Sequence, residues 1–202
     1  MISFVALLAM SSISTAATPP PATPINPHPW QKALLKEKPT HGISMGSLFV
    51  LFEKTTLDDV RRAASLGEIS HQGDAGESIY WLCYTSLRSS PVERIWVIAH
   101  GEIGGSAHSV TSISAQIVPN GKATTDCPSL PANLMPLSLD NNLWLNSAES
   151  DALKKFGSPS YQEKTWRSYY FNDKKLDSGS WLWLQAEKGR VTSLHAGQVT
   201  GF

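Results

Sequence analysis

The sequence predicts an α+β protein built from two tandem repeats, each a helix packed on an antiparallel sheet of about four strands. The first observation is an internal match: residues 110–115 and 191–196 share four identical residues and one Ile/Leu exchange. The second is that helix and strand signals upstream of these segments follow in the same order in both halves of the chain. We therefore expect repeat 1 at residues 44–118, a connector at 119–136 and repeat 2 at residues 137–202.

Each expected repeat contains one helix that follows an apolar segment. The apolar segments are residues 47–54 and 137–145, and the helices are residues 56–66 and 147–156. N-cap residues and first-turn acids mark both helix starts: Thr55 or Thr56 with Asp58 and Asp59, and Asn146 or Ser147 with Glu149 and Asp151. The helices are expected to end at Gly67 and Gly157, because glycine adopts the left-handed C-cap conformation at little cost.

Three strand-like runs follow each helix, separated by glycine-rich turns. They are residues 79–84, 94–98 and 110–115 in repeat 1, and residues 168–171, 181–184 and 191–196 in repeat 2. Because side chains alternate along a strand, Leu182 and Leu184 are expected beneath the helix, while Trp181 and Trp183 line the opposite face. Trp96 alternates with its aliphatic neighbours in the same way.

An uncovered sheet face that carries large aromatic side chains is typical of a protein-binding surface. Such rings supply much of the binding energy at interfaces, about 2 kcal/mol or more for each hot-spot residue. The candidate protein-binding residues are Trp96, Trp181, Trp183, Tyr80 and Tyr170. The alternative is that these rings fill the contact between the two repeats.

The N-terminal region is interpreted as an export signal followed by a tether. An apolar run at residues 2–10 is too short to span a bilayer and leads into small residues of the kind that precede a signal-peptidase cut. We expect a signal peptide at residues 1–17, and a proline-rich tether with a short helix at residues 18–43. The expected helix covers residues 30–38. No cysteine stands at the cut to accept a lipid, and the expected location is periplasmic or secreted.

The two cysteines are expected to form a disulfide. Cys83 lies in a strand-like run and Cys127 lies in the connector, and an even pair usually bonds in an oxidising compartment. A nucleophilic Cys83 is the functional alternative, but no neighbouring cation in the sequence lowers its pKa.

Charge and motifs argue against nucleic-acid binding and against catalysis. Seventeen basic and seventeen acidic residues balance, so there is no long-range attraction for a polyanion. His100, Glu102 and His108, with His71 or Asp74, could form a metal site, but their spacing matches no known ligand motif. We expect a non-enzymatic protein with no cofactor, no metal and no catalytic residues. A metal-dependent hydrolase that uses the His100–His108 region is the alternative.

The exported, aromatic-faced repeat of a helix and a four-stranded sheet resembles the β-lactamase-inhibitor-protein-like fold, whose unit occurs singly in small outer-membrane-assembly lipoproteins. The segment at residues 73–84, with the glycines at 101–105, is also similar to uncharacterised bacterial envelope proteins of this type. The resemblance implies a non-enzymatic binder, such as an inhibitor or an immunity protein against a secreted toxin. The implied partner is another protein, with no nucleic acid and no stable membrane insertion. An envelope-assembly scaffold is the alternative.

Overall fold

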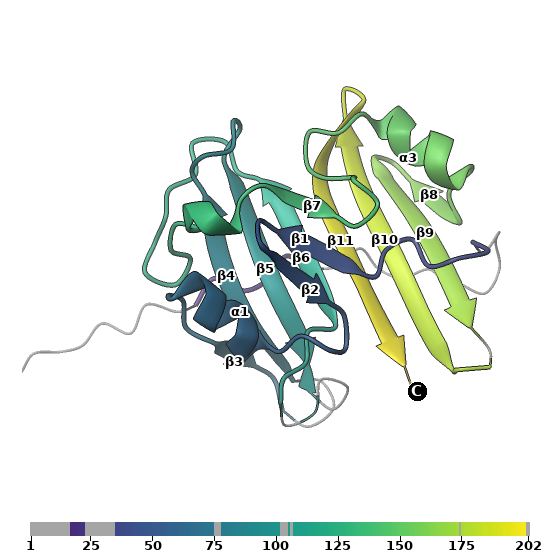
Figure 1. Cartoon of the computed structure of the whole chain (residues 1–202). Helices are drawn as coiled ribbons and strands as arrows, with labels where there is room; N and C mark the ends of the chain where they lie inside the picture. Colours follow the sequence, from purple (N-terminus) through teal and green to yellow (C-terminus); the bar gives the residue numbers. More distant parts are fainter. Residues whose placement is uncertain are drawn as a thin grey trace, which may run out of the picture.

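In the part of the chain that the structure describes, the protein is an α+β structure in which an antiparallel eight-stranded sheet carries a three-stranded sheet and two short α-helices on one face (Figure 1). The computed structural model describes residues 17–22, 35–74, 78–101, 105, 107–173 and 175–200. The expected α+β class is therefore confirmed at this level.

The large sheet runs continuously through both halves of the chain. Its strands, in spatial order, are β3 (Ser70–Gln72), β4 (Ile79–Ser86), β5 (Glu93–His100), β6 (Ser112–Ile117), β11 (Arg190–Thr200), β10 (Ser178–Glu187), β9 (Trp166–Asp173) and β8 (Tyr161–Glu163). The two halves meet edge to edge, because β6 pairs with β11. The two halves of the large sheet therefore lie side by side rather than stacked.

The small sheet consists of β2 (Leu48–Leu51), β1 (Gly42–Met45) and β7 (Leu137–Leu139) in spatial order. The apolar segment expected at residues 47–54 thus forms only the second strand of a hairpin. Gly46 makes the turn with φ of +55°, a conformation that L side chains rarely adopt. An added Cβ there would lie 2.1 Å from the carbonyl oxygen of Asn133, so the turn also needs the missing side chain.

Helix α1 (Leu57–Ala64) begins where the sequence predicts it. Thr56 is the N-cap: its hydroxyl accepts from the amide of Asp59 at 3.1 Å, and the Asp59 carboxylate accepts from the amide of Thr56 at 2.9 Å. The expected end at Gly67 is wrong. Ser65 already takes the left-handed conformation with φ of 54°, and its amide donates to the carbonyl of Arg62, which stops the helix earlier.

For helix α3 (Glu149–Phe156) the sequence predicts the end correctly but not the N-cap. Its end before Gly157 is confirmed, with that glycine at φ of +74°. Its N-cap is Ala148 rather than Asn146 or Ser147. The Ser147 hydroxyl is engaged elsewhere, because it accepts from the amide of Trp144 at 3.1 Å.

All six expected strand runs overlap strands of the large sheet, whereas the three-residue edge strands β3 and β8 were not expected. The short helix predicted at residues 30–38 lies mainly outside the described residues, and residues 35–38 are not helical.

The main core lies between the large sheet and the layer made by the helices and the small sheet. One line of cross-strand neighbours shows its continuity: Leu82, Val97, Ile113, Ala196, Leu182 and Tyr169, all buried. Leu57 and Val60 of α1 and Ala152 of α3 pack into the same cluster. The placement of Leu182 beneath the helical layer is as expected from alternation, and it leaves the tryptophans on the other face.

Candidate protein-binding face

The face of the large sheet opposite the helices carries most of the tryptophans. Two lines of cross-strand neighbours cross it: Cys83, Trp96, Ser114, His195, Trp183 and Ser168 form one, and Trp81, Ile98, Ser112, Gly197, Trp181 and Tyr170 form the other. We refer to this surface as the tryptophan face. Its first half is formed by β3 to β6, and its second half by β8 to β11.

Four of the five predicted binding residues lie on this face: Trp96, Trp181, Trp183 and Tyr170. Tyr80 does not, because it precedes Trp81 in β4 and therefore points to the helical side. Its ring is stacked between His71 and His108, with centroid distances of 4.4 and 3.9 Å. Tyr80 is thus separated by the sheet from the other four residues.

Small residues occupy the centre of the tryptophan face. Ser112 and Ser114 of β6 and Gly197 of β11 lie between the tryptophans of the two halves. An added Cβ on Gly197 would lie 2.5 Å from the Trp181 ring, so the glycine allows this indole to approach the backbone. A cavity of about 170 Å³ extends from here toward the second half, and its lining includes Ser114, His195, Trp166, and Pro21 and Ala22 of the N-terminal segment.

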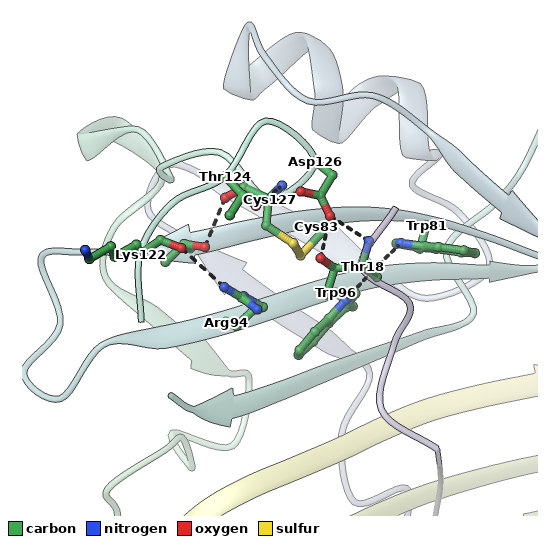
Figure 2. The surroundings of a disulfide bond; sticks show 10 residues. Thr18, Trp81, Cys83, Arg94, Trp96, Lys122, Thr124, Asp126 and Cys127 are labelled. Atoms are coloured by element: carbon green, nitrogen blue, oxygen red, sulfur yellow. Dashed lines mark hydrogen bonds between the residues drawn. A yellow bond between two sulfur atoms is a disulfide. The ribbon is translucent and has the colours of Figure 1, made fainter. Parts of the chain in front are cut away.

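The first half of the tryptophan face is covered by the chain itself. Trp81 and Trp96 are each 2% exposed. Their indole N–H groups donate to one acceptor, the carbonyl oxygen of Thr18, at 3.0 and 3.2 Å (Figure 2). Trp96 is consequently not part of an open surface, contrary to the expectation that it lines one. Alternation placed it on the right face, but the long-range contact with Thr18 was not visible in the sequence.

Asp126 holds Thr18 in this position. The Thr18 amide donates to the Asp126 carboxylate at 2.6 Å, and the Thr18 hydroxyl donates to the same oxygen. The Thr124 hydroxyl donates to the other carboxylate oxygen at 2.7 Å. Burial raises the pKa of Asp126, but the hydrogen bonds from Thr18 and Thr124 outweigh it and lower the pKa to about 2. The carboxylate is therefore charged at neutral pH.

The disulfide between Cys83 and Cys127 is confirmed, and it fixes the connector beside β4. The Thr85 amide donates to the carbonyl of Pro128 at 2.8 Å, and the Thr85 hydroxyl donates to the carbonyl of Cys127 at 3.0 Å. Closing a loop with a sequence separation of 44 is worth about 4 kcal/mol in the chain-entropy account. Because Asp126 is adjacent to Cys127, the same bond positions the carboxylate that holds Thr18 (Figure 2).

Between the two halves, Ser114 and His195 form a buried polar pair. The Ser114 hydroxyl lies 2.6 Å from Nδ1 of His195, whose ring is packed against Trp181 and Trp183 at centroid distances of 6.0 and 5.6 Å. Burial, with a smaller contribution from His100, lowers the pKa of His195 to about 3. The imidazole is therefore neutral at physiological pH.

The second half of the face differs from the first. Trp166, Trp181 and Trp183 are each partly exposed. Within the described residues, none of their indole N–H groups has a hydrogen-bond acceptor, and that of Trp181 is buried. An unsatisfied buried donor costs about 1–3 kcal/mol, a cost that applies to Trp181 and not to the partly exposed Trp166 and Trp183.

The described histidines of the alternative metal site have other partners. Nδ1 of His100 lies 2.6 Å from the Thr111 hydroxyl, and His108 stacks on Tyr80. Among the described residues there is no group of three or more His, Cys, Asp or Glu side chains that could hold a metal ion. Glu102 lies outside the described residues.

Sequence reasoning missed Thr18, Asp126 and Trp166 as site residues. Trp166 stands just outside the strand run predicted at residues 168–171, and only the register brings it to the tryptophan face. Thr18 was assigned to a tether, and no local pattern indicates that it contacts Asp126, which is 108 positions away.

No family model matches the chain, and no curated protein or solved structure matches it either. The disulfide indicates an oxidising compartment. In the part of the chain that the structure describes, none of the helices has the length and apolar character needed to cross a membrane.

Proposed function

We propose that this protein is an exported, non-enzymatic protein-binding module, and that the second half of its tryptophan face binds an extended segment of a partner protein. The observation that carries the proposal is the contrast between two indole pairs. One pair shares a backbone carbonyl of the protein's own chain, and the other has no acceptor among the described residues.

The strand register identifies the corresponding pairs. Trp96 is opposite Ser114, and Trp183 is opposite His195. In the pairing of β4 with β5, Trp81 lies opposite the residue two positions after Trp96. In the pairing of β9 with β10, Trp166 lies opposite the residue two positions after Trp183. Trp166 and Trp183 therefore correspond to Trp81 and Trp96.

The same register supports a tandem repeat. Helix α1 precedes β3 to β6, and helix α3 precedes β8 to β11. Ser114 and His195 occupy the same position in the matching segments at residues 110–115 and 191–196, and they are direct cross-strand partners. Two copies of one unit, related by an approximate twofold axis through this pair, would produce such a register.

The covered half indicates what the other half would bind. Thr18 presents a backbone carbonyl to two indole N–H donors, and three prolines follow it, so the covering segment is extended and has few amide donors of its own. Aromatic grooves recognise such segments through carbonyl acceptors and ring contacts. We infer that a partner segment offers a carbonyl to Trp166 and Trp183 in the same way.

The cellular compartment of the protein indicates which kind of partner protein it would meet. A disulfide and an aromatic sheet face suit a protein that acts in the periplasm or outside the cell. The resemblance to β-lactamase-inhibitor-like proteins favours an inhibitor or immunity protein that captures another exported protein.

Site-specific photocrosslinking tests the proposal. A photoreactive phenylalanine analogue is placed at Trp183 in the exported protein, and at Leu153 as the matched control. Leu153 is 42% exposed on α3, on the other side of the sheet. We expect a crosslinked partner protein from position 183 and none from position 153, and we expect Trp183→Ala to weaken capture of that partner while the far-UV circular dichroism spectrum stays unchanged.

Two outcomes would overturn the proposal. One is crosslinking from position 183 only to the protein's own N-terminal residues, which would make this half self-covered as well. The other is undiminished capture of the partner by the Trp183→Ala variant.

A further inference from the structure

All the backbone and side-chain polar groups of Thr18 are bound by the body of the protein. Its amide nitrogen and its hydroxyl donate to Asp126, and its carbonyl accepts from Trp81 and Trp96. A residue at the start of a flexible tether would not need four such contacts. This pattern indicates a dedicated site for this one residue, built from two strands and the disulfide-bound connector (Figure 2).

The site has the electrostatics of a cation site. Asp126 makes no ion pair with a Lys, Arg or His side chain in the described part of the chain. Its oxygen lies 2.6 Å from the backbone nitrogen of Thr18, slightly shorter than the range of about 2.7–2.9 Å for charge-assisted N–H···O bonds. A positive charge at that nitrogen would complete the ion pair.

The sequence supplies a way to place that charge. Residues 15–17, Thr-Ala-Ala, stand immediately before Thr18 and have the small side chains that signal peptidases accept before a cut. Hydrolysis of the Ala17–Thr18 peptide bond consumes one water and leaves a carboxylate on Ala17 and an amine on Thr18. An α-amino group has a pKa of about 7.7–8.0, so this amine is mostly protonated at neutral pH.

We propose that the chain is cleaved between Ala17 and Thr18 and that Asp126 binds the α-ammonium group of the new N-terminus. The tryptophan pair then binds the carbonyl of the same residue, so the first half of the tryptophan face is a receptor for the processed end of its own chain. This proposal does not depend on the identity of any partner at the second half.

The cleavage position is tested on the exported protein. Full-length protein is expressed with its own N-terminal region, recovered from the periplasm or the medium, and examined by N-terminal sequencing and intact mass. We expect Thr18 as the first residue. A different first residue, such as Ala17, or an uncleaved chain would overturn the proposal without affecting the proposed function of the second half.

The ammonium site is tested separately by titration. In the processed protein, nuclear magnetic resonance of the Thr18 α-amino group should give a pKa raised by about 1 unit or more, because the Asp126 carboxylate favours the charged form. Asp126→Asn should return this pKa to its ordinary value. Asp151→Asn, which removes an exposed carboxylate on α3, is the matched control and should leave the pKa raised. An ordinary pKa in the unmodified processed protein would contradict the ion pair.

Stability provides an independent readout. A group whose pKa is raised on folding stabilises the protein fully below its unfolded pKa, and this stabilisation disappears as the pH rises through the folded pKa. The melting temperature of the processed protein should therefore fall more between pH 7 and pH 10 than that of a form that keeps Ala16 and Ala17. Equal falls for the two forms would overturn the proposal.

Discussion

The two halves of the tryptophan face carry corresponding indole pairs, yet one pair is core and the other is surface. Trp81 and Trp96 are each 2% exposed, beneath Thr18 and beside the disulfide. Trp166 and Trp183 are partly exposed and have no indole acceptor among the described residues. The strands that present them are alike, so the difference comes from what lies on the sheet and not from the sheet itself.

Alternating tryptophans in a strand sequence therefore do not show whether the rings will be buried in a core or exposed on a binding surface. Trp96 and Trp183 each stand between two aliphatic residues, and in both halves these aliphatic neighbours face the helical layer. In the first half, Trp81 and Trp96 form a second, smaller core cluster with the two cysteines, and Ala17 packs against it. Variants that change one half at a time test whether the two halves differ in this way.

The largest expected effect is that of Trp96→Ala. Because this ring is buried, its loss should lower the free energy of unfolding by about 3–5 kcal/mol. The matched variant Trp183→Ala should lower it by about 1 kcal/mol or less, because Trp183 is partly exposed. Urea denaturation followed by circular dichroism measures both values. Equal losses for the two variants would show that the halves do not differ as described.

Removal of the disulfide should have the next largest effect. The double variant Cys83→Ala, Cys127→Ala should lose up to about 4 kcal/mol of stability, since the unfolded chain regains the freedom of the connector loop. Release of the connector should also expose Trp81 and Trp96, which lie in the same cluster as the two cysteines. A red shift of tryptophan emission under native conditions would report this exposure. An unchanged spectrum would mean that Thr18 covers the first half without help from the connector.

A pH dependence should identify the polar pair between the halves. Burial lowers the pKa of His195 in the folded protein to about 3, whereas an unfolded histidine has a pKa of about 6.5. Below the unfolded pKa only the unfolded chain takes up this proton, so stability should decrease as the pH falls from about 6.5 toward 3. The slope should approach about 1.4 kcal/mol per pH unit. His195→Gln should flatten it, and an unchanged slope in this variant would assign the effect to other groups.

Much of the local structure could be predicted from the sequence. Thr56 and Gly157 mark helix ends because capping depends on neighbouring residues alone. The alternation of Trp181 and Trp183 with leucines places them on one face because strand geometry has a period of two. The end of α1 was less predictable, because Ser65 adopts a left-handed conformation that serine seldom favours, with its amide bonded to the carbonyl of Arg62.

The α+β class, the side of the sheet on which the tryptophans lie, and the pairing of Cys83 with Cys127 can all be inferred from the sequence. It takes the folded structure to show that the sheet halves join through β6 and β11, that Tyr80 lies apart from the other candidate residues, and that Trp96 is buried. The two groups of features differ in the sequence separation of the residues that interact. Caps and alternation follow from bonds within a few residues, whereas the cover over Trp96 depends on Thr18, which is 78 positions away.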